Sequence, residues 1–308
     1  MRLVRDLDAQ DLCPRGSAVT IGNFDGLHRG HAALIGRARD QASAHNLDAA
    51  VITFDPMARE YFAPSASPAR IYNASERLRL LSDMGIDLLW LLRFNVALAH
   101  TQAEDFVLSL LVRGLRARHI VVGHDFRFGK GRVGDIRLLQ ALGSSHGFEV
   151  SEAPIIGDKE ERISSTGVRK ALWQGQFERV QSLLGRPYRM FGRVVRGNRL
   201  GHQLGMPTAN IRLHRVCSPL HGIFAVTVDG AGFEQRAAVA SVGSRPTVDG
   251  TQMLLEVHVF DFDGDLYGQH LEVEFVKKLR EEERFESLEA LTAQMRLDAQ
   301  QARALLAA

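Results

Sequence analysis

The sequence predicts an α/β protein of two domains: an N-terminal parallel sheet with helices on both faces, and a C-terminal antiparallel β-barrel with a terminal helix. The chain has 308 residues, about twice the length of a typical domain. Up to about Leu184, apolar runs of strand length alternate with helical patterns. From Gly185 onward, short strands and glycine-rich turns replace them. We therefore expect two domains, 1–185 and 186–308.

The N-terminal elements follow from apolar runs separated by helical spacing. Strands are expected at Ala18–Gly22, Ala49–Phe54, Ile86–Leu92, His119–Gly123 and Phe148–Ala153, and helices at Ala32–His45, Ser75–Met84 and Thr101–Leu115. Ser75 is expected to cap the second helix. Ligands of open parallel sheets sit beyond the carboxyl ends of the strands. The segments 22–31, 123–135 and 163–169 follow such ends or lie near them, so we expect them to form one crevice.

The C-terminal half is predicted to be antiparallel because its strand-length runs are short and separated by turn residues. These runs are Tyr188–Val195, Gly222–Val228, Ala237–Val242, Met253–Phe262 and His270–Val276. Asp263-Gly264 lies between the last two runs and is typical of a tight hairpin. Ser287 is expected to cap a final amphipathic helix whose apolar side carries Leu288, Leu291, Met295, Ala302 and Leu305.

The composition of the chain argues against several classes of protein. Apolar residues make up 45% of the chain and charged residues 24%, and no run approaches the roughly 20 apolar residues of a membrane span. The first residues carry charge and have no apolar signal-peptide core, and Cys13 and Cys217 are too few for a disulfide scaffold, so we expect a cytoplasmic protein. The formal charge of +2 is small, and we expect neither nucleic acid nor a membrane as partner.

The most informative segment joins the first predicted strand to the first predicted helix. Gly22 and Gly26 let the backbone approach an anion closely, and a helix that begins near His31 offers free N–H groups. His28 and His31 share one helical face, which suits a triphosphate. The alternatives are a structural histidine pair or a zinc site, but zinc needs a third ligand and no cysteine or carboxylate cluster stands at ligand spacing nearby.

The string Gly22-Asn-Phe-Asp-Gly-x-His-x-Gly-His31 resembles the bifunctional riboflavin kinase/FAD synthetases, and its shorter core resembles the His-x-Gly-His nucleotidyltransferases. The resemblance implies a Rossmann-like nucleotidyltransferase domain that transfers AMP from ATP to FMN. It implies two catalytic histidines, which neutralise charge on the reacting phosphates, and a nucleotide-binding turn; these are His28 and His31, and Gly22, Asn23, Asp25 and Gly26.

Two further fragments extend this resemblance. Arg162-Ile-Ser-Ser-Thr-Gly-Val-Arg169 matches the family's Ile-Ser-Ser-Thr-x-x-Arg motif, which implies that Ser165, Thr166 and Arg169 bind ATP phosphates. Gly167 departs from the pattern, since many members carry an arginine there.

The fragment 122–135 resembles the family's Gly-x-Asp/Asn-Phe-x-Phe-Gly loop and implies that Asp125 contacts flavin. Phe126 and Phe128 fit either flavin contact or the core.

A separate set of motifs lies in the C-terminal half. Gly205-Met-Pro-Thr-Ala-Asn210 closely resembles the Gly-x-Pro-Thr-Ala-Asn motif of riboflavin kinases, which implies that Gly205, Thr208 and Asn210 bind nucleotide phosphates and that Thr208 and Asn210 hold Mg²⁺. In Leu254–Phe260, alternation places Leu255, Val257 and Val259 on one strand face and Glu256 on the other. The match to Leu-Glu-x-His implies that Glu256 is the general base of the kinase.

The two motif sets together predict a bifunctional transferase that converts riboflavin to FMN in domain 186–308 and FMN to FAD in domain 1–185. Its expected partners are small molecules, namely riboflavin, FMN and ATP, with ATP as co-substrate and Mg²⁺ as cofactor; no oligomeric state is predicted. Two alternatives stay open: a chain with one working site, because of Gly167, and a flavin carrier without turnover. Release of ADP or pyrophosphate separates the carrier from the enzyme.

Overall fold

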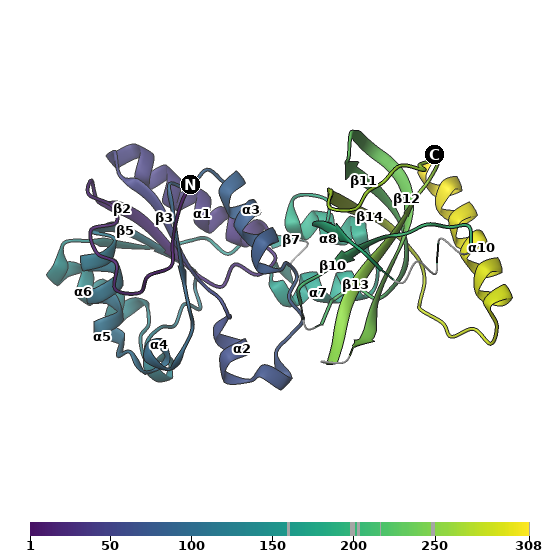
Figure 1. Cartoon of the computed structure of the whole chain (residues 1–308). Coiled ribbons are helices and arrows are strands. Elements are labelled where there is room, and N and C mark those ends of the chain that lie inside the picture. Colours follow the sequence, from purple (N-terminus) through teal and green to yellow (C-terminus); the bar gives the residue numbers. More distant parts are fainter. Residues whose placement is uncertain (159–160, 198–200, 202–203, 216, 248–249, 308) are drawn as a thin grey trace. The chain divides into compact units, whose positions relative to one another are not determined.

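The computed structural model describes residues 1–158, 161–197, 201, 204–215, 217–247 and 250–307. The chain packs into two compact units (Figure 1). The N-terminal unit contains Met1–Pro68 and Arg77–Ile163, and the C-terminal unit contains Ala69–Glu76 and Ser164–Ala308. The functional boundary between residues 185 and 186 stays a prediction, because these packing units divide the chain elsewhere.

The N-terminal unit is built on a six-stranded sheet in which all neighbouring strands run parallel, in the order β1-β4-β3-β2-β5-β6. The strands are β1 (Arg2–Val4), β2 (Ser17–Ile21), β3 (Asp48–Phe54), β4 (Leu88–Leu92), β5 (Ala117–Val122) and β6 (Glu149–Glu152). The five predicted strands are confirmed, and β1 is an addition at the sheet edge. A small antiparallel pair, β7 (Gly157–Asp158) and β8 (Glu161–Arg162), follows.

Helices cover both faces of this sheet (Figure 1). On one face, Ile35 of α1 (Arg29–His45) and Leu81 of α3 (Ala74–Asp83) pack with Val51 and Leu89 of the sheet. On the other face, Trp90 packs under α4 (Val96–His100), α5 (Ala103–Phe106), the π-helical η2 (Val107–Gly114) and α6 (Ile136–His146). The short helices are α2 (Ala58–Phe62), η1 (Pro64–Ala66) and η3 (Lys130–Arg132).

Helix starts differ from the predictions by a few residues. The first helix begins at Arg29 instead of Ala32, with His28 as its N-cap. The cap of α3 is Asn73, because its Oδ1 accepts the Glu76 N–H at 2.9 Å, whereas Ser75 lies inside the helix. The expected helix 101–115 is divided into α5 and η2. Local propensity identifies a helix better than its first residue.

The C-terminal unit contains a closed barrel of six antiparallel strands in the order β10-β13-β12-β11-β14-β9. Helices α7 (Ser165–Trp173) and α8 (Phe177–Leu184) precede the barrel. Its strands are β9 (Arg189–Val195), β10 (Ala209–Arg212), β11 (Gly222–Gly230), β12 (Phe233–Thr247), β13 (Gly250–Val259) and β14 (His270–Arg280). The predicted barrel is confirmed, with β10 as the strand that the sequence pattern did not reveal.

The predicted hairpin at Asp263-Gly264 is wrong. β13 pairs with β12 on one side and with β10 on the other, so neither of its edges is free for β14. The chain crosses instead to pair β14 with β11 and β9. Barrel closure therefore overrides a local turn signal.

The barrel interior is apolar, and helix α8 packs against part of it. Phe177 of α8 lies 5.9 Å, between ring centroids, from both Phe224 of β11 and Phe275 of β14. Phe224 and Phe275 are themselves buried and meet edge to face at 5.3 Å. The segment before residue 186 thus belongs to the packing of the barrel.

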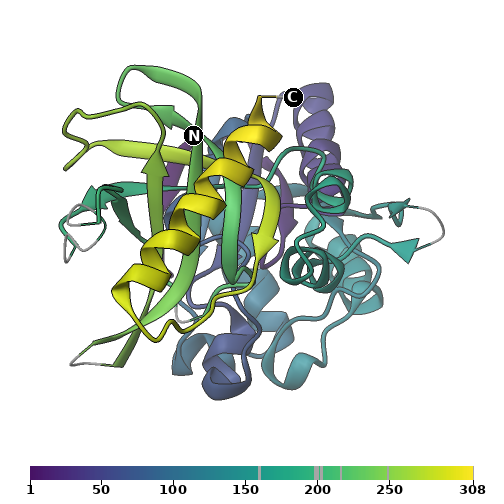
Figure 2. The same ribbon diagram turned by 90° about the vertical axis from the view of Figure 1, so that its right-hand side faces the viewer.

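The terminal helix α10 (Leu288–Leu306) lies across the outer face of the barrel (Figure 2). Ser287 caps it as predicted, since its Oγ accepts the Ala290 N–H at 3.1 Å. The predicted apolar side is only partly right: Leu288 and Leu305 are 54% and 43% exposed, whereas Asp298 is buried.

Asp298 is buried because it has partners on both sides. Its two carboxylate oxygens accept hydrogen bonds from Nε and Nη2 of Arg280 at 2.9 and 2.8 Å, and Gln294 Nε2 donates to Oδ1 at 2.9 Å. The pair fixes α10 to the end of β14. None of the helices within the described ranges combines the length and apolar character that crossing a bilayer requires.

We predict that Asp298→Ala lowers the free energy of unfolding by about 2–4 kcal/mol, because it leaves the partly buried Arg280 guanidinium without its carboxylate. Urea unfolding followed by circular dichroism measures this loss. Asp263→Ala, which removes an exposed carboxylate, is the control and should change stability by less than about 0.5 kcal/mol. Equal stability of the two variants would contradict this role of Asp298.

Candidate functional site

A cavity of about 360 Å³ opens on the outer face of the barrel, a volume suited to a small ligand. Three parts of the C-terminal unit surround it: the segment before β10, the outward residues of strands β10 to β13, and the segment from Arg280 into α10. Its polar lining includes Thr208, Asn210, Ser241, Ser244, Glu256, His258, Arg280, Glu282, Glu283 and Asp298.

One row of cross-strand partners supplies the floor of this cavity. Asn210 of β10 lies directly opposite Glu256 of β13, and Glu256 lies opposite Ser241 of β12. The row continues through Ile223 to Arg280. Directly opposed residues bring their Cβ atoms within about 4.5–5.5 Å of each other. The amide of Asn210 and the carboxylate of Glu256 are therefore neighbours by register.

Strand alternation determines which side chains face the cavity. Leu255 and Val257 are fully buried in the barrel, while Glu256 between them faces outward, as predicted. Ala209 and Ile211 likewise point inward on either side of Asn210. Asn210 is nevertheless only 5% exposed, because the chain before β10 covers it.

The Gly205–Asn210 segment is held close to the barrel by specific contacts. Gly205 has φ +76°, a conformation that favours glycine. Nδ1 of His258 donates to the Pro207 carbonyl at 2.8 Å. At Gly197, a Cβ atom would lie 2.6 Å from the side-chain amide of Asn210, so any larger residue there would displace that amide.

The amide of Asn210 suits a hard cation. Its Nδ2 donates to the Thr208 carbonyl at 3.2 Å, and its buried Oδ1 has no hydrogen-bond partner among the residues that the structure describes. The hydroxyl of Thr208 lines the same cavity. Mg²⁺ takes oxygen ligands, and a buried oxygen without a donor gains most from such an ion. The residues present therefore fit Mg²⁺.

Two further carboxylates, Glu282 and Glu283, line the cavity. Burial raises the pKa of Glu282, and the neighbouring carboxylate of Glu256 raises it further. The charge of His221 and, to a smaller extent, that of Arg280 lower the pKa of Glu282 again, and the hydrogen bonds of Arg280 to Asp298 raise the pKa of its own guanidinium. The cavity thus offers carboxylates near an oxygen-rich wall, an arrangement suited to proton removal beside phosphate.

In the N-terminal unit, the two predicted histidines lie together at the start of α1. His28 is the N-cap, and its Nδ1 accepts the His31 N–H at 3.3 Å. The two rings stack, with centroids 3.7 Å apart and planes inclined by 16°. Gly30 leaves room for this arrangement, because a Cβ atom there would approach the His28 ring to 3.2 Å. The helix thus presents N–H groups and imidazoles at one end.

The turn before α1 is strained and firmly held. Phe24 and Leu27 both have positive φ angles, +48° and +44°, and both are fully buried. The buried guanidinium of Arg77 donates to the carbonyls of Asn23 at 2.9 Å and Phe54 at 2.8 Å. Such strained loops persist when the surrounding structure fixes them, and they concentrate at functional sites.

The remaining turn residues have different exposures. Asn23 is exposed and Gly22 is half-buried, whereas Gly26, with φ +85°, and Asp25 are buried. The structure thus brings the predicted nucleotide-binding turn and both histidines into one part of the N-terminal unit.

The predicted phosphate-binding residues Ser165, Thr166 and Arg169 belong to α7 and hence to the C-terminal unit. Ser164 caps this helix by accepting the Gly167 N–H at 3.2 Å. Arg169 Nε donates to the Ala69 carbonyl at 2.6 Å. The joint action of these residues with His28 and His31 stays a prediction.

Asp125 lies after β5, at the carboxyl end of the sheet. Its exposed carboxylate accepts a hydrogen bond from Arg162 Nη2 at 3.0 Å, which lowers its pKa. Phe128 is 5% exposed and stacks on Phe126 in the core cluster. Of the two readings of these phenylalanines, the structure supports the core.

Comparison with known proteins agrees with the two sets of residues. A family model described as FAD synthetase matches residues 10–167, and one described as riboflavin kinase matches residues 184–306. Bifunctional riboflavin kinase/FMN adenylyltransferases are 43% identical in Escherichia coli (strain K12), over 97% of this chain and 96% of that protein, and 45% identical in Pseudomonas fluorescens, over 100% and 98%. The chain belongs to the bifunctional riboflavin kinase/FMN adenylyltransferase family.

A solved structure shares the fold over almost the entire chain. The crystal structure of a protein from Streptococcus pneumoniae, described as a macrolide-efflux protein, superposes with a TM-score of 0.80 at 30% identity and covers 98% of this chain and 99% of its own. That description applies to the Streptococcus protein. Here the resemblance supports the arrangement of elements within each half.

Two groups of residues that line or surround the candidate sites were not found by the sequence motifs, one in each family region. In the riboflavin kinase region, Arg280 and Glu282 line the cavity; Arg280 ends β14, and Glu282 lies between that strand and the Ser287 cap.

In the FAD synthetase region, Phe54, Tyr61, Phe62 and Phe94 form a ring cluster with centroid distances of 5.2–5.8 Å. Phe62 is 66% exposed. Phe54 and Phe94 lie at and just beyond the carboxyl ends of β3 and β4, a position that could have suggested a ligand surface.

Proposed function

We propose that the cavity on the barrel binds riboflavin and ATP and transfers the γ-phosphate to riboflavin, giving FMN and ADP. We propose further that the FAD synthetase region transfers AMP from a second ATP to FMN, giving FAD and pyrophosphate. The observation that carries the kinase assignment is the cross-strand pairing of Asn210 with Glu256 at the cavity floor. It puts an oxygen ligand for a metal beside a carboxylate base.

In the kinase reaction, Glu256 accepts the proton of the terminal ribityl hydroxyl as that oxygen attacks the γ-phosphorus. The bond from this phosphorus to the bridging oxygen breaks, and ADP leaves. The outward position of Glu256 on β13 supports this role, because β13 is paired with β10 on one side and with β12 on the other, which anchors the backbone of Glu256. Phosphoryl transfer needs mainly positioning and charge stabilisation, which a rigid strand provides.

Mg²⁺ would be held by Thr208 and Asn210 together with phosphate oxygens and water. When bound, the ion neutralises charge on the ATP phosphates. Gly205 lets the backbone turn close to these phosphates, and His258 holds the Pro207 carbonyl. The unpartnered Oδ1 of Asn210 among the described residues supports the assignment.

In adenylyl transfer, a phosphate oxygen of FMN attacks the α-phosphorus of ATP and pyrophosphate leaves. His28 and His31 stabilise the developing charge from the start of α1, together with its free N–H groups. The turn Gly22–Gly26 lies beside them in the N-terminal unit and is proposed to receive the phosphates. Ser165, Thr166 and Arg169 of α7 are likewise proposed to bind ATP phosphates. The stacked histidine rings and the anchoring of this turn by Arg77 support the proposal.

The isoalloxazine ring of FMN is proposed to bind at the exposed aromatic cluster around Phe62, with Asp125 as a polar contact. A flat aromatic ligand gains stacking energy from such a surface. The enzyme is proposed to act in the cytoplasm.

We predict that Glu256→Gln lowers the rate of riboflavin phosphorylation by roughly 10²–10⁴, because glutamine keeps the size of the side chain but cannot take the proton. Riboflavin binding and conversion of supplied FMN to FAD should be retained. Initial rates of both reactions on the same preparation measure this. Glu286→Gln, at an exposed position outside the cavity, is the matched control. Unchanged FMN formation in Glu256→Gln would refute the assignment.

We predict that His28→Asn lowers FMN adenylylation by roughly 10²–10³ while keeping the helix intact, because asparagine is itself a good N-cap but lacks the imidazole. His28→Ala should lose the same activity and, in addition, about 1 kcal/mol of stability. FAD formation from supplied FMN and thermal unfolding measure the two effects, with riboflavin phosphorylation as internal control. Normal FAD formation by His28→Asn would show that His28 is only a cap.

We predict that Arg77→Lys lowers FMN adenylylation by roughly tenfold, because one ammonium group cannot replace the two guanidinium hydrogen bonds to Asn23 and Phe54. The turn before α1 should then lose its fixed shape. Arg79→Lys, on the same helix, is the control. Equal rates in both variants would argue against a role of Arg77 in holding the turn.

A further inference from the structure

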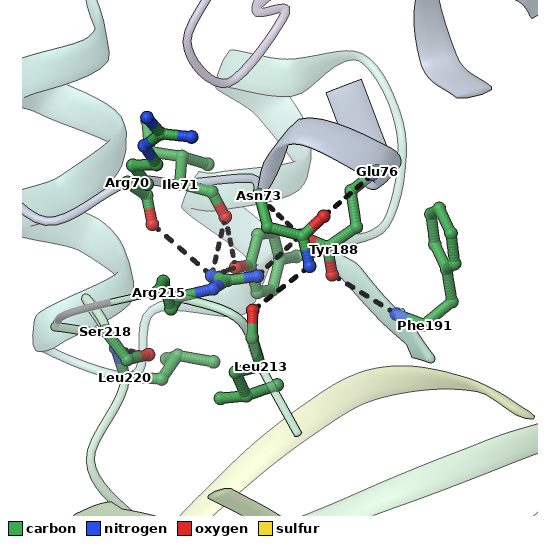
Figure 3. A network of polar contacts seen from close by, with 10 residues as sticks. All are labelled: Arg70, Ile71, Asn73, Glu76, Tyr188, Phe191, Leu213, Arg215, Ser218 and Leu220. Carbon is green, nitrogen blue, oxygen red and sulfur yellow. Dashed lines mark hydrogen bonds and ion pairs between the residues drawn. The ribbon is translucent and has the colours of Figure 1, made fainter. Parts of the chain in front are cut away.

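Residues 69–76 lie between two parts of the N-terminal unit in the sequence but pack within the C-terminal unit. We call them the inserted segment. Figure 3 shows the polar network that joins this segment to the chain around strands β9 and β10. It is independent of the motifs that identified the family.

The centre of the network is an ion pair that is excluded from solvent. Glu76 Oε2 lies 2.5 Å from Arg215 Nη2, and both side chains are fully buried. Arg215 Nη1 also donates to the carbonyls of Ile71 at 3.0 Å and Arg70 at 3.3 Å. The hydroxyl of Tyr188 donates to the same Ile71 carbonyl at 2.7 Å. Both the backbone and a side chain of the inserted segment are thus engaged.

Such a pair resists separation. Removing one partner of a buried ion pair leaves an uncompensated charge, which costs far more than the loss of a surface pair. Burial raises the pKa of Glu76, while Arg215 and the N–H groups of Asn73 and Phe191 lower it. These donors stabilise the carboxylate inside the unit and fix the inserted segment in one position.

The network contacts both strands that carry the nucleotide segment. Glu76 Oε1 accepts the Phe191 N–H of β9 at 3.3 Å. Asn73 Nδ2 donates at 3.1 Å to the Leu213 carbonyl, one residue beyond the end of β10. β9 and β10 pair with each other, and the chain that joins them contains Gly205–Thr208. The inserted segment therefore holds both strands on the side away from that connection.

We propose that Asn73 and Glu76 are positioning residues of the kinase cavity. By fixing β9 and β10 they set the place of Thr208 and Asn210 opposite Glu256. The proposal rests on the proposed kinase function of this cavity. It means that a piece of the FAD synthetase region is a structural part of the kinase, so residues 186–308 by themselves lack a support of their own active site.

Asn73→Asp in the full chain is the sharpest test. Aspartate keeps the oxygen that caps α3 but replaces the Nδ2 donor by an oxygen that faces the Leu213 carbonyl. We expect KM for ATP in riboflavin phosphorylation to rise about tenfold, equivalent to about 1.4 kcal/mol, with kcat within about threefold of wild type. Conversion of supplied FMN to FAD should stay within about twofold of wild type.

Asn95→Asp is the matched control for the kinase reaction. Asn95 caps α4 in the same way, with Oδ1 accepting the Leu98 N–H at 3.0 Å, but it lies in the N-terminal unit. It should leave KM for ATP in the kinase reaction unchanged. Hydrogen exchange gives a second readout: amides of β9 and β10 should exchange faster in Asn73→Asp than in wild type, and amides of β11 and β12 at the same rate.

The outcomes separate this inference from the proposed function. If wild type forms FMN and Asn73→Asp has the same KM, the positioning role is wrong. Equal losses in both reactions, or faster exchange throughout the C-terminal unit, also overturn it, since they indicate general destabilisation. If wild type forms no FMN, the proposed kinase function fails. The hydrogen-exchange rates of β9 and β10 in Asn73→Asp then test by themselves whether Asn73 holds these strands in place.

Discussion

Closure of the six-stranded barrel is the constraint on which the C-terminal site depends. β9 pairs with both β10 and β14, which leaves no free edge and fixes the register of every strand. Because side chains alternate along a strand, a slip of one residue between β10 and β13 would turn Asn210 or Glu256 into the apolar interior. The relative positions of Asn210 and Glu256 in the cavity are therefore a consequence of strand register.

The inserted segment and the ion pair of Glu76 with Arg215 extend this constraint to chain that lies far away in the sequence. Glu76 and Arg77 are consecutive, yet Glu76 is anchored beside β9 within the C-terminal unit, and Arg77 holds the turn before α1 within the N-terminal unit. One turn of α3 thus supplies one anchoring residue to each unit.

Sequence reasoning succeeded where the deciding information is local. Strand alternation placed Glu256 outward, and the glycines and histidines of 22–31 indicated a turn followed by a helix, although α1 begins three residues earlier than predicted. It failed where distant pairing decides: Asp263-Gly264 has hairpin residues, but both edges of β13 are already occupied. The predicted helix Ser75–Met84 takes in only the end of the inserted segment, and nothing in residues 69–76 shows that Arg215 will lie beside Glu76. The four residues of β10 were too few to show a strand period.

The central claim is that two sites act in sequence, the first making FMN and the second consuming it. It is tested most directly by incubating the purified full chain with riboflavin, ATP and Mg²⁺ and separating riboflavin, FMN and FAD over time. The account predicts that FMN forms first and is then converted to FAD, with ADP released in step with FMN formation and pyrophosphate in step with FAD formation. Bound riboflavin without release of ADP or pyrophosphate would contradict it and identify a flavin carrier.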